Sequence, residues 1–285
     1  MIISLNYKIV DDISFFLEAE KTDIETLSKK ANVSKTLIYE LLKTGITTKQ
    51  NYERIYSYFY YLGYRINKVK EEFLKETSKI ILFHGSKNGL EKILYDGSRK
   101  SCDFGEGFYL GESFDNAACF VCENNNASIY SFELSLTGLN VVEFECSLEW
   151  MITICYYRGT IKEYNNSETV KKMIEKVENA DVIIAPIADN RMFYIMSLFA
   201  NGDINSEAAV HSLSASFMGK QFVLKTEKSL DNLKAIEKYY LCQLEKDNYI
   251  TFLNNRTNEI ETKLKMAKRE YRDGLYIEEL LKWEL

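Results

Sequence analysis

The hydrophobic period of this chain changes near residue 75. Before that point apolar residues recur at helical spacing, whereas residues 79–122 contain short apolar runs punctuated by glycine. A helical period predicts helices, and short apolar runs bounded by glycine predict strands. We therefore expect a helical domain over residues 1–75, followed by a domain that is built on a sheet.

Two of the expected strands carry side chains suited to a ligand site. The run Lys79–Phe83 leads directly to His84, and Tyr109 lies in a second run that is surrounded by Gly105, Gly107 and Gly111. Glycine inside a strand pattern indicates a bulge or the close approach of another group to the backbone. Each signal alone also fits an ordinary hairpin. Their combination favours a site that holds a flat ring.

The motifs LFHGS, GFYLG and Ser-x-x-Asn-Ala resemble the ADP-ribosyltransferase fold of the histidine-tyrosine clade, which includes diphtheria-type toxins and poly(ADP-ribose) polymerases. Within that clade, DFGEGFYLGESFDNA, IAPIADNRMF and GKQFVLKTEKSL are similar to a bacterial family, DUF3990, over roughly residues 79–235. The resemblance implies an α+β catalytic domain over residues 76–235, with two packed small antiparallel sheets and helices. It also implies that the protein binds NAD as a substrate.

The same resemblance implies a role for each matching residue. His84 would hydrogen-bond the adenine-side ribose of NAD, the Gly85 backbone would hold the nicotinamide carboxamide, and Tyr109 would stack on the nicotinamide ring. The other residues expected to contact NAD are Ser86, Arg99, Asp103, Phe104, Gly105, Gly107, Phe108, Asn116 and Ala117. Arg99 is suited to the pyrophosphate because a guanidinium forms bidentate phosphate contacts, although a surface salt bridge explains it equally well.

The third residue of the motif departs from the best-known transferases, which carry a glutamate at the start of a late strand. Gln221 stands at the matching position, ahead of the β-prone run Phe222–Lys225. A glutamine can hydrogen-bond a ribose hydroxyl, but it cannot remove a proton from an acceptor, because a carboxamide is not basic near neutral pH. We expect His84, Tyr109 and Gln221 to be the catalytic residues, without polymer elongation.

Cleavage of the bond to nicotinamide depends on positioning more than on proton transfer. The ribose gains oxocarbenium character and nicotinamide leaves without a proton, so fixed dipoles in a desolvated site supply the catalysis. Deprotonation of a weakly nucleophilic acceptor needs another group, and Asp189 is preferred over Glu106 and Glu227. Asp189 and Arg191 follow a strand expected at residues 181–184, where a helix N-cap explains Asp189 as well as a substrate role does.

The helical domain contains a segment, LSKKANVSKTLIYELLKTG, that resembles the helix-turn-helix of repressor-like regulators. Thr22 with Glu25 predicts a capping box on its first helix, and Ser34 predicts a cap on its second. The candidate contacts of the second helix with DNA are Lys35, Thr36 and Tyr39. Residues 1–75 contain twelve Lys and Arg against ten Asp and Glu, a net of +2, so a protein partner is an equal alternative.

After Gln221 helical spacing returns, over Leu230–Glu245 and Glu259–Tyr271. These segments predict a C-terminal helical extension over residues 236–285. The expected fold class is thus α+β: an all-α helix-turn-helix domain, an ADP-ribosyltransferase fold and a helical extension.

The composition is that of an ordinary soluble chain, with 285 residues, a formal charge of −6 and a pI near 5.3. No run reaches the eighteen or so apolar residues of a membrane span, and the amino terminus shows no basic leader. We expect a cytoplasmic protein that does not bind a membrane and whose six cysteines stay reduced. Cys119 and Cys122 have zinc-ligand spacing, but no second Cys or His pair accompanies them, so no metal is expected.

These patterns predict a mono-ADP-ribosyltransferase that cleaves NAD and transfers ADP-ribose to a protein or nucleic acid. Bacterial enzymes of this fold often act as toxins, so the resemblance implies a toxin or phage-defence effector with an antitoxin partner. A first alternative is a helix-turn-helix transcription regulator or partner-binding module that senses NAD or ADP-ribose without turnover. A second alternative is an NAD glycohydrolase, which uses water as the acceptor.

Overall fold

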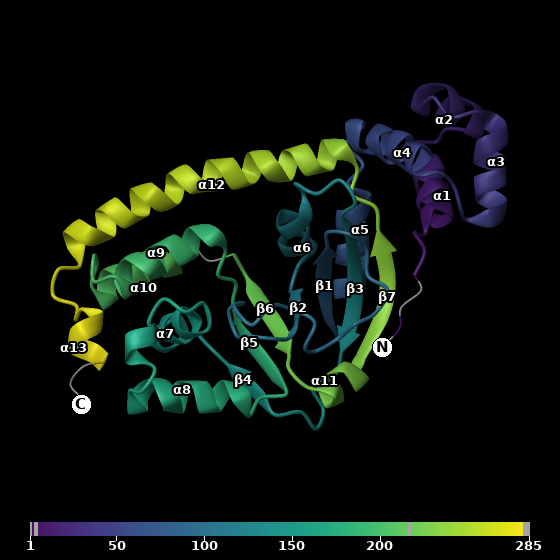
Figure 1. Cartoon of the computed structure of the whole chain (residues 1–285). Helices are drawn as coiled ribbons and strands as arrows, with labels where there is room; N and C mark the ends of the chain where they lie inside the picture. The colour runs from purple at the N-terminus through teal and green to yellow at the C-terminus, as the bar shows by residue number, and fades with distance from the viewer. Residues whose placement is uncertain (1, 3–4, 216–217, 282–285) are drawn as a thin grey trace.

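The computed structural model describes residue 2, residues 5–215 and residues 218–281. The chain begins with a group of helices, at the right of Figure 1. They are α1 (Ile9–Ala19), α2 (Ile24–Ala31), α3 (Lys35–Thr44), α4 (Lys49–Tyr61) and α5 (Ile66–Lys75). This agrees with the helical character expected for residues 1–75.

A seven-stranded mixed sheet forms the middle of the molecule (Figure 1). Its strands are β1 (Ile80–Ser86), β2 (Phe108–Gly111), β3 (Ser128–Leu134), β4 (Val141–Glu143), β5 (Val182–Pro186), β6 (Lys220–Leu224) and β7 (Leu233–Tyr239). The strand order is β4-β5-β6-β2-β1-β3-β7, and β4 and β5 are parallel while the other neighbours are antiparallel. The strands expected around His84, Tyr109, Asp181 and Gln221 are confirmed.

The sheet corrects the expectation of two separate antiparallel sheets. One half consists of β1, β3 and β7, and the other of β2, β6, β5 and β4. The halves are joined where Phe83 of β1 pairs with Gly111 of β2. Apolar side chains from both halves, among them Leu82, Phe132 and Phe222, pack into one cluster on the same side. Hydrogen bonding and the shared core therefore make the two halves one sheet.

Helices cover the opposite side of the sheet. Helix α6 (Phe114–Val121) packs on β1, while α7 (Leu148–Tyr157), α8 (Glu168–Glu178), α9 (Asn190–Ala200) and α10 (Ser206–Ser214) pack together beside β5 and β6. Several of these helices begin at a residue whose side chain accepts a backbone N–H, as expected of N-caps: Ser113, Ser147, Asp189 and Asn205. A short 3₁₀ helix, Lys162–Tyr164, precedes α8.

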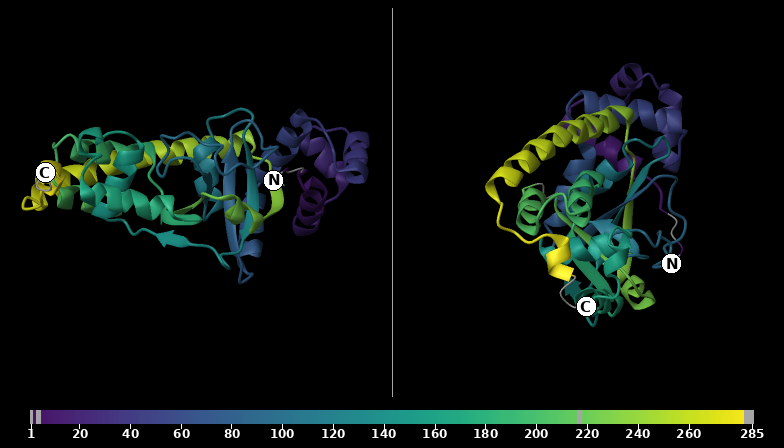
Figure 2. Two further views of the ribbon diagram at one scale, coloured as in Figure 1. Left: turned by 60° about the horizontal axis from the view of Figure 1, so that its bottom comes forward. Right: turned by 60° about the vertical axis from the view of Figure 1, so that its left-hand side comes forward.

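The C-terminal part of the chain spans the molecule. Helix α11 (Glu227–Asp231) leads into β7, and the 28-residue helix α12 (Gln243–Glu270) then runs across one side to α13 (Ile277–Leu281) (Figure 2). Helix α12 contacts α4, α6, α9 and α10. It therefore joins the N-terminal helices to the helices beside β5.

Two local expectations were wrong. Leu230–Glu245 was expected to be helical, but Leu233–Tyr239 is the edge strand β7, because the unpaired edge of β3 supplies hydrogen-bond partners from Leu134 to Ile129. The helix of residues 24–31 is capped by Asp23, which accepts from the backbone of Thr26 at 2.8 Å, and not by Thr22. Asp23 is one residue closer to the helix and has the extended backbone that an N-cap needs.

The N-terminal helices are anchored to the sheet. Tyr240, which follows β7, packs into their apolar core, and Lys70 of α5 forms ion pairs with Asp12 of α1 and Glu237 of β7, both at 2.6 Å. Helix α5 also contacts α6 and β1. No helix within residues 5–215 and 218–281 is long and apolar enough to span a membrane.

Candidate functional site

The histidine and the tyrosine of the two motifs lie on neighbouring strands. His84 lies near the end of β1, and its Nδ1 is 2.8 Å from the backbone oxygen of Tyr109 on β2. This contact lies next to the Phe83–Gly111 pair that joins the two halves of the sheet. The side chain of His84 thus continues the connection between β1 and β2 where their backbones separate.

The hydrogen bond also determines the state of the imidazole. A carbonyl oxygen only accepts hydrogen bonds, so Nδ1 must carry the proton and donate it. Burial lowers the pKa of His84, and the ring stacks on Phe108 at a centroid distance of 4.5 Å. A neutral ring with a proton on Nδ1 has a lone pair on Nε2. His84 therefore presents a hydrogen-bond acceptor of the kind that a ribose hydroxyl needs.

Tyr109 holds the turn that contains Asp103 and Gly105. Its hydroxyl donates to the backbone oxygen of Gly105 at 2.7 Å and accepts from the backbone N–H of Phe104 at 3.1 Å. Lys225 also donates to the backbone oxygens of Phe104 and Glu106, both at 2.6 Å. Burial raises the pKa of Tyr109, so its hydroxyl keeps its proton. The half-buried ring is thus tied to the backbone of this turn by two hydrogen bonds.

Gln221 lies on the same face of the sheet as Tyr109. Gly111 pairs with Gln221 and Tyr109 with Val223, and alternate residues of a strand point to the same face. The Gln221 amide nitrogen donates to Asp103 Oδ2 and to the backbone oxygen of Pro186, both at 3.0 Å. The amide is buried, and its nitrogen donates to these two acceptors. The His84 ring lies on the other face, beside Phe108.

Arg158, which no sequence motif indicated, completes this cluster. Its Nε donates to Asp103 Oδ1 at 2.8 Å and its Nη2 to the same oxygen at 2.5 Å, while Nη2 also donates to the backbone oxygen of Ala188 at 3.0 Å. The guanidinium carbon lies 4.2 Å from the ring centre of Phe193. Arg158 directly follows α7 and precedes a glycine, a position typical of a helix end, and nothing local signals its partner 55 residues earlier.

Three of the motif glycines are required by packing. A Cβ atom at Gly85 would lie 2.5 Å from the backbone oxygen of Ala117, at Gly107 it would lie 2.5 Å from Val223 Cγ1, and at Gly111 it would lie 2.7 Å from Asn116 Cβ. Gly105 has a φ of +73°, which favours glycine in the turn. Close packing of α6 and β6 against β1 and β2 thus accounts for these residues without a ligand.

The other residues that were predicted to contact NAD lie on or near β1 and β2. Ser86 donates to the backbone oxygen of Gly89, and Asn116 donates to that of Met218 at 2.9 Å. Arg99 is exposed, whereas Phe104 and Ala117 are buried.

Asp189 and Arg191 lie next to the Asp103 cluster. Asp189 accepts from the backbone of Arg191 at 3.0 Å and of Met192 at 2.9 Å, and it pairs with the Arg191 guanidinium at 3.3 Å. The expected N-cap is therefore confirmed. Arg158 contacts the preceding residue, Ala188, so Asp189 stands at the edge of the polar cluster.

The candidate DNA contacts all lie on the first turns of α3, which follows α2 after the turn 32–34. Ser34 caps α3 as expected, since its hydroxyl accepts from the backbone of Leu37 at 3.3 Å. Lys35, Thr36 and Tyr39 are exposed, but Lys35 forms an ion pair with Glu25 at 3.0 Å. This ion pair reduces the positive charge that the helix presents.

A family model described as a protein of unknown function, DUF3990, matches residues 80–235, more than half of the 285 residues. The chain belongs to the DUF3990 family. No curated protein and no solved structure gives a significant match. The segment that matches DUF3990 begins at β1 and ends within β7, so it contains His84, Tyr109, Asp103, Arg158 and Gln221.

One cavity of this protein is lined in part by residues outside the DUF3990 segment. This cavity of about 280 Å³ opens at the junction of this segment with the N-terminal helices and with α12. None of its lining residues belongs to the predicted NAD contacts. Among the described residues, no group of three or more His, Cys, Asp and Glu side chains is arranged to hold a metal ion.

Proposed function

We propose that this protein is an NAD-dependent mono-ADP-ribosyltransferase that acts as a toxin or phage-defence effector. The observation that carries the proposal is the hydrogen bond from His84 Nδ1 to the backbone oxygen of Tyr109 at 2.8 Å. It joins the His84 side chain to the backbone of the GFYLG strand, and it leaves His84 Nε2 as an acceptor, while the Tyr109 ring lies on the other face of the sheet. NAD would have to pass between β1 and β2, where their backbones separate beyond the Phe83–Gly111 pair, to reach His84 with a ribose and Tyr109 with nicotinamide.

The hydrogen-bonded turn next to Tyr109 supports a mechanism that depends on positioning. Loss of nicotinamide needs no proton donor, and the described side chains near Tyr109 are held by intramolecular hydrogen bonds before any ligand arrives. Such preorganised groups stabilise developing charge without reorganisation during the reaction. Asp189 is the carboxylate proposed to accept a proton from the acceptor.

Radiolabelled NAD tests the proposal directly. The purified protein is incubated with labelled NAD in a bacterial lysate, and nicotinamide release is measured together with label in protein, RNA and DNA. Tyr109→Ala is expected to lower turnover more than tenfold, which corresponds to about 1.4 kcal/mol of transition-state stabilisation. Tyr61→Ala is the matched control, because Tyr61 is 78% exposed and lies on α4.

Two further variants test the tyrosine hydroxyl and the histidine separately. Tyr109→Phe keeps the ring but loses the hydrogen bonds to Gly105 and Phe104, so stacking on nicotinamide would be retained while the turn is loosened. His84→Ala removes the ribose contact. Unchanged turnover in both His84→Ala and Tyr109→Ala would refute the site.

The geometry of Gln221 favours one alternative, a protein that senses NAD or ADP-ribose without turnover. Its amide is occupied by Asp103 and Pro186, and it cannot act as a base. The labelling experiment distinguishes the three functions. NAD binding without nicotinamide release supports the sensor, and release without transfer of label supports a glycohydrolase. Label in one macromolecular fraction supports the transferase and identifies the class of acceptor.

A toxin role makes a further prediction in cells. Expression of the wild-type protein in bacteria would arrest growth, and Tyr109→Ala would relieve the arrest. An antitoxin encoded beside it would be expected to do the same by binding.

A further inference from the structure

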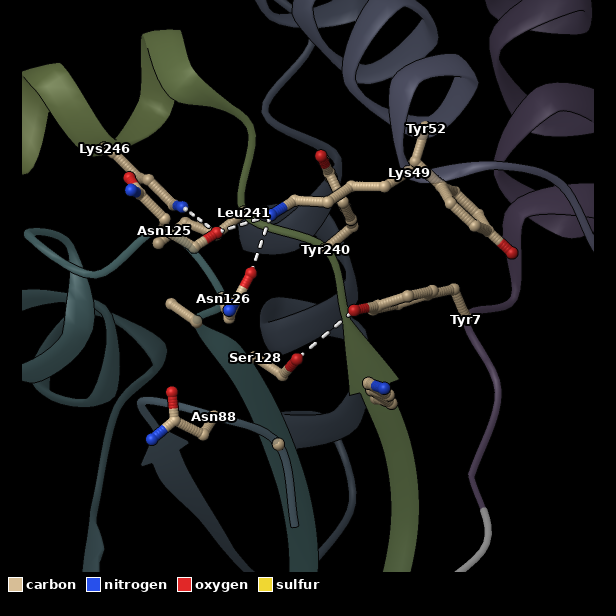
Figure 3. Close-up of a pocket in the computed structure, with 13 residues that line it drawn as sticks. Tyr7, Lys49, Tyr52, Asn88, Asn125, Asn126, Ser128, Tyr240, Leu241 and Lys246 are labelled. Carbon is tan, nitrogen blue, oxygen red and sulfur yellow. Dashed lines mark hydrogen bonds between the residues drawn. The ribbon is translucent and has the colours of Figure 1, made fainter.

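The cavity of about 280 Å³ is built from segments far apart in the sequence (Figure 3). Its walls come from the segment before α1, the start of α4, the loops after β1 and before β3, and the link from β7 to α12. The side chains that matter most are Tyr7, Lys49, Asn88, Ser128, Lys238 and Lys246. Four of these six lie outside residues 80–235, so the cavity is a feature of the whole chain and not of the DUF3990 segment alone.

Two lysine ammonium groups converge on one side of the cavity. Lys49 Nζ donates to the backbone oxygen of Asn125 and to Asn126 Oδ1, both at 2.9 Å. Lys246 Nζ donates to the backbone oxygens of Asn124 at 2.9 Å and of Asn125 at 3.4 Å. Figure 3 shows the two side chains reaching Asn125 from different sides. Because they share one carbonyl oxygen, two positive charges are held next to each other.

No carboxylate forms a close ion pair with these described lysines. Within the described parts of the chain, no ion pair of 4.0 Å or less involves Lys49, Lys238 or Lys246, although the chain has 42 acidic residues against 36 basic ones. The carboxylate of Glu53 lies near Lys246 and partly offsets its charge, while its oxygens accept hydrogen bonds from Ser57, Tyr240 and Gln243. Burial, and to a lesser degree the charge of Lys49, lowers the pKa of Lys246. An anion placed between the two ammonium groups would relieve their repulsion.

The other wall of the cavity is aromatic and polar. The Tyr7 ring contacts Tyr52 and Tyr240 edge-on, with centroid distances of 4.9 and 5.5 Å, and the Tyr7 hydroxyl lies 3.2 Å from Ser128 Oγ. Lys238 Nζ lies 4.6 Å from the Tyr7 ring centre, which adds a third positive charge. Hydroxyl groups and the amide of Asn88 offer hydrogen bonds that suit a sugar or a base.

We propose that this cavity is a second ligand site, which binds a small phosphate-bearing molecule of the nucleoside monophosphate class. The phosphate would lie between Lys49 and Lys246 and accept an N–H from each, since each ammonium has three donors and spends two on the loop 124–126. The nucleoside would lie against Tyr7 and Asn88. The cavity volume lies just below the ~300–1,000 Å³ that is usual for ligand pockets, which favours a mononucleotide over a dinucleotide such as NAD.

The site lies between two helices that are far apart in the sequence. Lys49 is the first residue of α4 in the helical domain, and Lys246 is in the first turn of α12. A phosphate held by both would tie these helices to the loop before β3. The inference does not depend on the proposed NAD chemistry, because no residue is shared between the two sites.

Calorimetric titration of the full chain with adenosine monophosphate and with inorganic phosphate tests the proposal. Adenosine monophosphate is expected to bind, with inorganic phosphate competing more weakly. Lys49→Met and Lys246→Met should each weaken binding at least tenfold, while Lys49→Arg, which keeps the charge, should retain most of it. Lys234→Met is the matched control, because Lys234 is an exposed lysine on the same strand as Lys238 and does not line the cavity.

The same titration of the His84→Ala variant shows whether the nucleotide binds at the NAD site instead. Binding that survives His84→Ala but falls in Lys49→Met supports the proposal, even if Lys246→Met fails to fold. Binding that is lost in His84→Ala and unchanged in Lys49→Met would assign the nucleotide to the NAD site and overturn it. No binding of either probe at millimolar concentration, or binding of an oligonucleotide alone, would overturn it as well.

Discussion

The change Gln221→Glu tests whether Asp103 dictates a glutamine at this position. The wild-type amide donates two hydrogen bonds, to Asp103 Oδ2 and to the backbone oxygen of Pro186, both at 3.0 Å. A hydrogen bond to a charged group contributes ~1.5–3 kcal/mol and a neutral one about 1 kcal/mol, so their loss should cost ~2.5–4 kcal/mol of unfolding free energy. A carboxylate at this position would also face the Asp103 carboxylate.

The like charges make the loss depend on pH. Repulsion from Asp103 and burial should raise the pKa of the new carboxyl in the folded state above its unfolded value of ~4.3. Below the unfolded value both states are protonated and no charge penalty exists. As the pH rises, the unfolded state loses its proton first, and the penalty grows by about 1.4 kcal/mol for each unit of pKa difference until it levels off above the folded pKa.

Urea denaturation followed by far-UV circular dichroism, at about pH 5 and about pH 8, measures this effect. Gln221→Met is the matched control, because it loses the same hydrogen bonds without adding charge and should be destabilised equally at both pH values. Asp103→Asn in the Gln221→Glu background should restore part of the stability lost near pH 8. A Gln221→Glu protein that is as stable as wild type at pH 8, or that shows no more pH dependence than Gln221→Met, would refute the reasoning.

Three further predictions concern packing, pH and capping. Gly85→Ala should cost ~1–3 kcal/mol in a urea titration, because the new Cβ would lie 2.5 Å from the backbone oxygen of Ala117; an unchanged midpoint would contradict this. Burial raises the pKa of Glu245 from 4.5 to about 8. Its contribution to stability is therefore complete below its unfolded pKa and is lost as the pH rises through about 8. Between about pH 5 and 9, the melting temperature of Glu245→Gln should change less with pH than that of the wild type. An equal dependence of the melting temperature on pH in both proteins would show that Glu245 is not responsible. Ser34→Ala should cost about 1 kcal/mol through loss of the α3 cap, whereas Ser14→Ala, on α1, should change the melting temperature little.

Much of the secondary structure followed from local patterns. The strand that leads to His84, the strand around Tyr109 and the caps Ser34 and Asp189 lie where expected. Each of these features depends on residues that are close in sequence: an apolar run, a glycine or a side chain within three residues of the N–H it accepts. Residues 233–239 were missed because an amphipathic segment becomes an edge strand only when a partner strand is available, and β3 provides one.

The candidate site was predictable only in part. The motifs singled out His84, Tyr109 and Gln221, whose strands do lie next to one another, and Asp103, which lies in the turn before β2. Their hydrogen bonds could not be predicted from local patterns. Gln221 is 118 residues away from its partner Asp103 in the sequence, and Arg158 is 55 residues away from it. Fold-level pairing of β2 with β6 and packing of α7 against the sheet decide which polar groups meet. The same is true of Lys49 and Lys246, which carry no motif.

The sequence by itself determined the helical N-terminal region, the main strands, the turn glycines and the pair of motif residues, since these depend on propensities and spacings within a few residues. Only the tertiary structure decided that the strands form one sheet joined at Phe83 and Gly111, that the Gln221 amide is committed to Asp103, and that a lysine-lined cavity forms between distant segments. The physical reason is that buried polar groups take whichever partners the packing of distant elements brings within hydrogen-bonding distance, and sequence spacing does not encode that distance.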